Sequence, residues 1–142
     1  MRKLALSDDI LLKIEKPARY IGNEVNSVMK NKADIDVRFA FVFPDVYEIG
    51  MSHLGIQILY DMLNRRDDVW CERVYSPWTD LDKIMREEQI PLFALESQDP
   101  IKDFDFVGIR FNTRCVTPTF CRFLIWRRFR SLQRIERRNI RL

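Results

Sequence analysis

The distribution of apolar runs along the chain predicts an open α/β sheet. Runs rich in β-branched and aromatic residues predict strands over 37–43, 69–75, 91–95 and 104–109. The first, VRFAFVF, is almost wholly apolar, which is typical of a central strand buried on both faces. In the two longer intervals between these runs, apolar residues recur at the spacing of an α-helix. The order strand, helix, strand, helix, strand, strand indicates a mostly parallel, Rossmann-like or flavodoxin-like sheet.

The helical segments carry apolar stripes that can lie on such a sheet. Over 53–64, the stripe consists of Ile56, Leu59, Tyr60 and Leu63. The next helix is expected from Thr79 to about residue 89. Its stripe is Leu81, Ile84 and Met85, and Thr79 with Asp82 resembles a capping box.

Two further helices are expected before the first strand. Ser7 is a suitable N-cap for a short helix that continues to about Lys16, where Pro17 stops it. A second helix is expected after Gly22. Residues 1–35 therefore form a helical leader to the sheet.

The charge of the chain changes abruptly between Ile109 and Arg110. Residues 1–109 hold fourteen Lys or Arg and twenty Asp or Glu, a net charge of −6. Residues 110–142 hold ten Arg, no Lys and one Glu, a net charge of +9. The sequence thus divides into the leader (1–35), an incomplete α/β domain (36–109) and an Arg-rich tail (110–142) that is expected to be helical.

Composition excludes several classes of protein. The chain has three cysteines, Cys71, Cys115 and Cys121, without a CxxC pair, so neither a disulfide framework nor a metal site is expected. No apolar run approaches the roughly 18 residues that a membrane helix needs. The first residues carry charges too early for a signal peptide, so a cytoplasmic location is expected.

Candidate site residues lie where the predicted strands end, since ligands bind beyond the carboxyl ends of the strands in such folds. His53, the single histidine, is expected at a helix start, either facing a ligand or packed against the domain. Glu48, Glu96 and Ser97 either line a pocket or are solvated loop residues. The loop between the first predicted strand and His53 has neither a P-loop nor a GxGxxG pattern. This argues against nucleotide binding through those motifs.

Three ordered segments resemble a known family. They are FVFPDVYEIGMSHLGIQILYDMLN, CERVYSPWTDLDKIMR and PLFALESQDPIKDFDFVGI, and KPARYIGNEVNSV before them resembles that family's leader. The chain resembles, from about Lys16 to Ile109, the N-terminal region of radical SAM proteins that carry a cobalamin-binding-like domain before their iron–sulfur domain.

The resemblance implies a Rossmann-like domain that holds cobalamin, or serves as a degenerate packing domain, against a radical SAM barrel. The barrel of the parent would bind a [4Fe–4S] cluster through a C-x3-C-x2-C motif, together with S-adenosylmethionine. This chain lacks that motif, so it is not expected to be catalytically competent alone. It also departs from the cobalamin motif D-x-H-x-x-G, because Met51 stands at the Asp position and Gly55 comes one residue early.

The predicted corrin-facing wall consists of Pro44, Glu48, Ser52, His53 and Ser97.

The tail has two alternative interpretations. Synonymous codons for residues 110–142, read two bases later, can encode LQYEMCYTNVLQILDLAKIP and further residues, which restores the family's LQYE and YTN segments. The favoured hypothesis is that the tail is a frameshift product. Alternatively, its interleaved arginines and aromatics bind RNA or an anionic membrane surface, and the chain is a small basic-tailed binding module.

Overall fold

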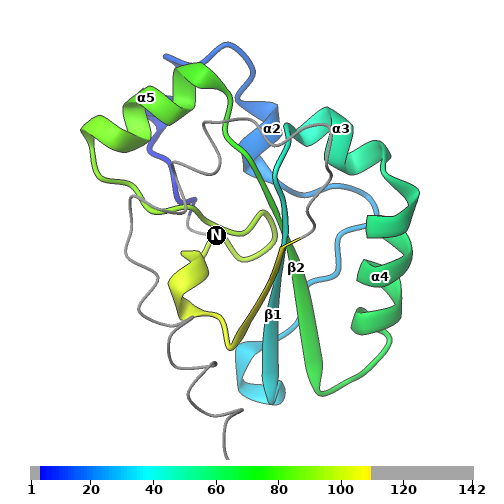
Figure 1. Cartoon of the computed structure of the whole chain (residues 1–142). Helices are drawn as coiled ribbons and strands as arrows, with labels where there is room; N and C mark the ends of the chain where they lie inside the picture. The colour runs from blue at the N-terminus through cyan, green and yellow to red at the C-terminus, as the bar shows by residue number, and fades with distance from the viewer. Residues whose placement is uncertain (1–3, 110–142) are drawn as a thin grey trace, which may run out of the picture.

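Three parallel strands form the centre of the structure, a computed structural model that describes residues 4–109 (Figure 1). The strands are β1 (Val37–Phe43), β2 (Val69–Tyr75) and β3 (Phe106–Ile109). β1 lies in the middle, in the order β2-β1-β3, and both pairings are parallel. This confirms the predicted α/β architecture and fits a truncated Rossmann-like sheet.

Helices cover the two faces of the sheet. α4 (Leu54–Asn64) lies on one face and α5 (Thr79–Glu87) on the other side of the molecule (Figure 1). Side chains alternate along each strand. Phe41, Phe43, Cys71 and Tyr75 therefore pack with α4, while Ala40, Val42 and Val74 pack with the helical residues of α5.

The predicted helical stripes are confirmed in large part. In α4, Ile56 and Tyr60 are buried and Leu63 packs against the same cluster, but Leu59 is 36% exposed.

In α5, Leu81 and Met85 are buried, and Ile84 packs against them. The capping box is not formed. The helix begins at Thr79, so Trp78 occupies the N-cap, and Asp82 pairs instead with Arg86 at 2.9 Å.

The prediction of a third strand over 91–95 is wrong. The segment makes one isolated antiparallel bridge, between Phe93 and Pro100. A turn over residues 95–97 follows the segment, and Gln98 after it takes a left-handed conformation (φ 66°). The run is apolar because residues 92–95 are buried, and burial alone does not distinguish a strand from other buried backbone.

The N-terminal helices are shorter than expected. α1 (Asp8–Leu11) ends five residues before Lys16, and α2 (Ala18–Ile21) precedes Gly22 instead of following it. Gly22 and Asn23 both have positive φ, 73° and 70°, so a helix cannot continue through them. Single 3₁₀ turns, η1 (Lys32–Asp34) and η2 (Ile101–Asp103), precede β1 and β3.

The segment after Gly22 covers the outer edge of β2 instead of forming a helix. The indole N–H of Trp70 donates to the Val28 carbonyl at 2.9 Å, and Lys30 Nζ donates to the Val69 carbonyl at 2.6 Å. Further along this edge, the Asn64 side chain bonds both the N–H and the carbonyl of Cys71, at 2.9 and 3.0 Å. The outward backbone groups of Val69 and Cys71 are thus bonded by side chains, and the Arg73 carbonyl accepts from the Leu95 N–H.

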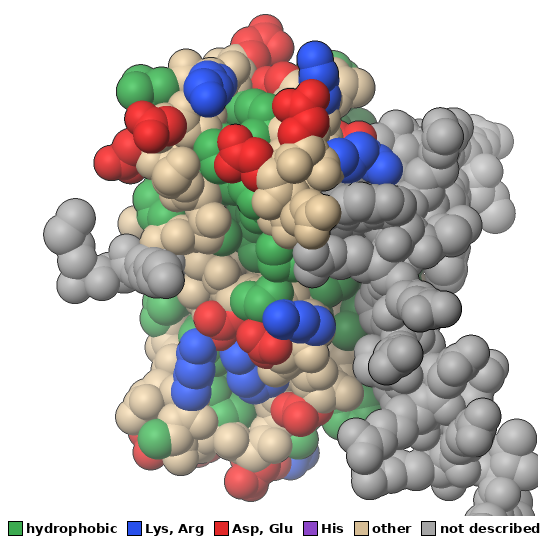
Figure 2. Space-filling view, turned by 90° about the vertical axis from the view of Figure 1, so that its left-hand side faces the viewer, with side chains coloured by type: hydrophobic (Ala, Val, Ile, Leu, Met, Phe, Trp, Pro, Cys, Tyr) green, Lys and Arg blue, Asp and Glu red, His purple; other side chains and the backbone are tan. Residues whose placement is uncertain are grey.

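Acidic side chains gather at the α5 end of the molecule, as Figure 2 shows for the face on that side. Glu87 and Glu88, at the end of α5, are both exposed. No helix in residues 4–109 has the length and apolarity to cross a membrane.

Gly50 provides a test of the packing between α3 (Tyr47–Ser52) and the end of β2. A Cβ at Gly50 would lie 2.1 Å from the Tyr75 ring. We expect Gly50→Ala to lower the free energy of unfolding by about 1–3 kcal/mol, because overpacking strains a close-packed core. Urea denaturation measures the change. Gly55→Ala, in α4, is the control, and its stability should be unchanged or slightly higher because Ala favours a helix.

Candidate functional site

The strand order switches at the carboxyl ends of β1 and β3, which is where open α/β sheets commonly bind ligands. The chain passes from β1 to β2 on one side, while β3 lies on the other side, so the strand order switches between β1 and β3. The loop that leaves β1 here contains α3, a helix that the sequence did not predict, and leads into α4. It carries four of the five predicted wall residues: Pro44, Glu48, Ser52 and His53.

The first turn of this loop is tied to the end of β2. Pro44 is fully buried, and Asp45 beside it is also buried. The Asp45 carboxylate accepts a hydrogen bond from the Val46 N–H at 2.8 Å, and its carbonyl accepts one from the Ser76 N–H at 2.9 Å. Pro44 is therefore part of the packed interior at this end of the sheet.

His53 forms the junction between α3 and α4. Its N–H donates to the Gly50 carbonyl at 3.1 Å, and its own carbonyl accepts from the Ile56 N–H at 3.0 Å. Its ring lies 5.5 Å from that of Phe43. Within the described residues, its Nδ1 is buried without a hydrogen-bond partner. An unsatisfied buried nitrogen is unusual and marks a position with spare capacity to bind a polar group.

Glu48 and Ser52 make contacts within the domain. Arg19, from α2, donates to the Glu48 carboxylate through Nε at 2.8 Å and pairs with it through a terminal nitrogen at 2.7 Å. Burial opposes ionisation of Glu48, but the Arg19 hydrogen bonds dominate and lower its pKa. Ser52 Oγ donates to the carbonyls of Glu48 and Ile49, at 2.9 and 3.0 Å. The hydroxyl thus completes the last turn of α3.

Ser97 lies apart from the other four residues. Its Oγ accepts a hydrogen bond from Arg38 at 3.0 Å, and its N–H donates to Glu72 at 2.8 Å. Arg38 is the second residue of β1, whereas His53 contacts Phe43 at the other end of the strand. Five residues of strand separate them, about 16 Å. The structure therefore does not bring Ser97 to the wall predicted from the sequence.

Exposed apolar side chains flank His53. Ile49, in α3, and Leu54, the first residue of α4, both lie largely in solvent. Together with His53 they form an apolar rim, which we call the crevice rim, at the carboxyl end of β1. Such a surface suits a flat, partly apolar group more than a phosphate or a metal ion.

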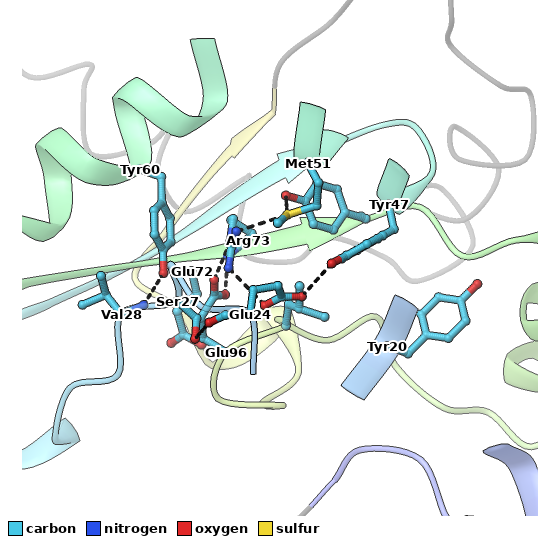
Figure 3. A network of polar contacts seen from close by, with 12 residues as sticks. Tyr20, Glu24, Ser27, Val28, Tyr47, Met51, Tyr60, Glu72, Arg73 and Glu96 are labelled. Atoms are coloured by element: carbon cyan, nitrogen blue, oxygen red, sulfur yellow. Dashed lines mark hydrogen bonds and ion pairs between the residues drawn. The ribbon is translucent and has the colours of Figure 1, made fainter. Parts of the chain in front are cut away.

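A buried ionic network surrounds Arg73 and reaches Met51 of α3 (Figure 3). Arg73, in the middle of β2, donates through Nε to Glu96 at 2.6 Å, and its backbone N–H donates to the same carboxylate at 2.7 Å. A terminal nitrogen pairs with Glu24 at 3.3 Å. The guanidinium also lies 4.5 Å from the centre of the Tyr60 ring. Glu96 is almost completely buried, so these contacts compensate for the loss of its hydration.

This network also holds α3 in place. Met51 Sδ accepts from Arg73 and from the Tyr75 hydroxyl, both at 3.1 Å, and the Tyr47 hydroxyl donates to Glu24 at 3.1 Å. Burial, reinforced by Glu24, raises the pKa of Tyr47 to about 12. The phenol therefore stays protonated and donates its hydrogen bond across the physiological range.

A second buried ion pair lies on the other face of the sheet from Arg73, between β1 and β2. Arg38 pairs with the fully buried Glu72 at 2.5 Å and with Asp99 at 2.9 Å. Its guanidinium lies 4.2 Å from the centre of the Phe104 ring. Asp99 also pairs with Lys32 at 2.5 Å. Burial opposes ionisation of Asp99, but Lys32 and Arg38 together lower its pKa.

The signal for these networks was present in the sequence. Glu72 and Arg73 interrupt a run, VWCERVY, that is buried along its whole length. Charged residues on a strand buried on both faces require ionic partners. Glu96 was considered as a pocket residue, but the sequence gives no information on which cation it meets, because Arg73 is 23 residues away.

Two hollows occur near these residues. A cavity of about 20 Å³, enough for one water molecule, is lined by Arg19, Tyr20, Arg73 and Tyr75 among others. A groove of about 490 Å³ runs past Lys32, Ser97 and Asp99. His53 lines neither of these two hollows.

Residues 4–109 show no group of three or more side chains that could hold a metal ion. Cys71, the described cysteine, is buried, and burial raises the pKa of its thiol to about 12. It is therefore neither a thiolate ligand nor a reactive nucleophile at neutral pH. Cys115 and Cys121 lie outside the described residues.

The strand order and its connections define a truncated, Rossmann-like α/β domain with a topological switch point between β1 and β3. The family model for radical SAM proteins, N-terminal, matches residues 55–138, more than half of the chain. The chain therefore belongs to this family. The matched range begins within α4 and continues past Ile109, the point at which the net charge of the sequence changes from negative to positive. No curated protein and no solved structure matches the chain.

The Arg73–Glu96 pair generates a stability prediction. Glu96→Gln removes the charge that compensates Arg73, so we expect the free energy of unfolding to fall by about 3–5 kcal/mol, measured by urea denaturation. The exposed pair Arg65–Asp61 is the control. Arg65→Gln should cost less than about 1 kcal/mol. Equal effects of the two substitutions would contradict the structural role assigned to Glu96.

Proposed function

We propose that residues 36–109 are the first part of a cobalamin-binding-like domain of a radical SAM enzyme, preceded by the leader 1–35. The observation that carries the proposal is the crevice rim at the β1/β3 switch point. There, Nδ1 of His53 has no hydrogen-bond partner among residues 4–109 and lies between two exposed apolar residues. Family membership supports the radical SAM parent.

Three residues in or beside the loop between β1 and α4 could contact a corrin directly, and the others would hold the loop in place. Ile49 and Leu54 offer an apolar surface for one face of the ring, and His53 offers a nitrogen to a polar substituent or to cobalt. Pro44, Glu48 and Ser52 would act by shaping and holding this loop, since their side chains are engaged within the domain. Ser97 would contribute only if the ligand extended to the other end of the sheet. Cobalamin, when bound, would supply the cobalt chemistry of the parent.

The chemistry of the parent would lie in further sequence. Its radical SAM barrel would be the partner of this domain and would hold the [4Fe–4S] cluster and S-adenosylmethionine. This chain would serve to bind cobalamin or to pack on the barrel, in a cytoplasmic protein. The comparisons give no support to the alternative of a module that binds RNA or a membrane through residues 110–142.

Cobalamin binding can be tested with the longer protein obtained by restoring the frame after Ile109. After addition of hydroxocobalamin and desalting, we expect a retained visible spectrum. Leu54→Asp, which places a charge on the crevice rim, should weaken retention about tenfold or more. Met29→Asp should not, because Met29 is also an exposed apolar residue but follows Val28, which is bonded to Trp70 of β2. Absence of retained colour in the unsubstituted protein would favour a degenerate packing domain.

The frameshift hypothesis makes a separate prediction about the gene. The DNA after codon 109 should encode LQYE in another frame, and a C-x3-C-x2-C motif should follow in that frame. Sequencing of this region gives the answer directly. Bases that cannot encode LQYE in any other frame would refute the frameshift and leave residues 110–142 as the true continuation of the chain.

A further inference from the structure

The groove beside Lys32, Ser97 and Asp99 lies at the other end of the sheet from the crevice rim. Ser97 contacts Arg38, the second residue of β1, whereas the rim follows the last residue of that strand. The groove has a volume of about 490 Å³, which is within the range of small-molecule sites. No residue of the crevice rim lines it. It is therefore a separate candidate site.

One side chain fixes the two walls of the groove relative to each other. Gln98, which is 6% exposed, accepts a hydrogen bond from the Ala5 N–H at 3.1 Å. Its amide nitrogen donates to the carbonyls of Tyr20 and Leu95, both at 3.0 Å. Ala5 and Tyr20 belong to the leader, and Gln98 belongs to the loop between α5 and β3. A ligand therefore need not order these walls, which lowers the entropic cost of binding.

Most of the lining is apolar. The bridge between Phe93 and Pro100 holds the loop between α5 and β3 against itself, so that its apolar side chains form a continuous wall. A surface of this kind binds a hydrocarbon body more favourably than a sugar or a chain of phosphates. The large apolar residues of the lining are Leu4, Ile90, Pro91, Phe93 and Pro100.

The polar residues of the lining retain hydrogen-bond donors. Ser97 Oγ accepts from Arg38 at 3.0 Å and from the Asp99 N–H at 3.1 Å, and its own hydrogen has no acceptor among residues 4–109. Lys32 Nζ pairs with Asp99 at 2.5 Å, and 56% of the Lys32 side chain is exposed. Because an ammonium group has three N–H donors, Lys32 can bind a ligand without releasing Asp99.

The carboxylate of this cluster is already balanced. Asp99 pairs with Arg38 at 2.9 Å as well as with Lys32, and its Oδ2, which both cations contact, is buried. A further cation would meet two positive side chains, whereas an anion would meet the exposed ammonium of Lys32. A carboxylate fits better than a phosphate, because a phosphate has more oxygens and more charge than two donor groups can satisfy.

We propose that this groove binds an amphipathic monocarboxylate, with its hydrocarbon chain along the apolar lining and its carboxylate on Lys32 Nζ and Ser97 Oγ. The inference does not depend on the proposed function, because the two sites share no residue and lie at opposite ends of the sheet. It gives a role to Ser97, which the structure separates from the wall predicted from the sequence.

Three compounds with the same alkyl chain and different head groups test the proposal: octanoate, octanol and octylamine. Their binding to the 142-residue chain is measured by isothermal titration calorimetry. We expect octanoate to bind about tenfold more tightly than either of the others, because charge-assisted hydrogen bonds are stronger than neutral ones. Lys32→Gln should remove this preference. Lys83→Gln, at an exposed lysine of α5 outside the lining, is the control and should retain it.

Nuclear magnetic resonance locates the bound carboxylate in the same protein. The backbone amide signals of Ser97 and Asp99 should shift when octanoate is added. The ring signal of His53, which reports on the crevice rim because His53 is the single histidine, should not shift. Urea denaturation checks that Lys32→Gln remains folded, as expected for the loss of a partly exposed ion pair.

The alternative outcomes are distinct. A shift of the His53 signal without shifts at Ser97 and Asp99 would place the compound at the crevice rim. Equal affinities for the three compounds would show an apolar groove without selectivity for a head group, and a preference for octylamine would identify a cation site at Asp99. Absence of binding by all three would show that the chain itself fills or closes the groove. Each of these results overturns the proposal.

Discussion

The packing of this domain depends on one buried ion pair, in which the Glu96 carboxylate balances the charge of Arg73. Arg73 stands on a strand whose every residue is buried, and without Glu96 its charge would face an apolar interior. The same guanidinium reaches Glu24 from the leader and Met51 from α3. One side chain thus links β2 to three segments that are distant in sequence. The loop that forms the crevice rim takes its position from this ionic interaction as well as from apolar packing.

The sequence predicted the parts of the fold that follow from periodicity. β1, β2, α4 and α5 each have a pattern long enough to identify, and each is present with nearly the expected bounds. The failures have local causes. Residues 91–95 are apolar because they are buried, and their backbone makes only one isolated bridge, between Phe93 and Pro100. The expected helix after Gly22 does not form. Gly22 and Asn23 have positive φ, and the segment after them is bonded instead to Trp70 and Tyr60 through Val28.

The candidate site was predicted less completely than the fold, for a geometric reason. Pro44, Glu48, Ser52 and His53 are close in sequence and follow one strand, so their proximity could be inferred. Ser97 was placed with them on the expectation that a strand over 91–95 would end at the same edge of the sheet. Since this strand does not form, Ser97 meets Arg38 near the amino end of β1. Which charged residues pair with one another, such as Arg73 with Glu96, depends on the tertiary fold. Their separation along the sequence does not reveal it.

The outer edge of β2 has a consequence for how such a sheet can grow. At residues 69, 71 and 73, the groups that face outward are bonded by a lysine, an asparagine amide, a glutamate carboxylate and one backbone N–H from Leu95. A further strand would have to displace all of them, including a carboxylate that balances a buried charge. The outward backbone groups of β2 at residues 69, 71 and 73 are therefore already bonded within the domain and are not free to pair with another strand. The sheet can be extended in one direction only, at β3, so added sequence can enlarge the domain without disturbing the part that is already folded.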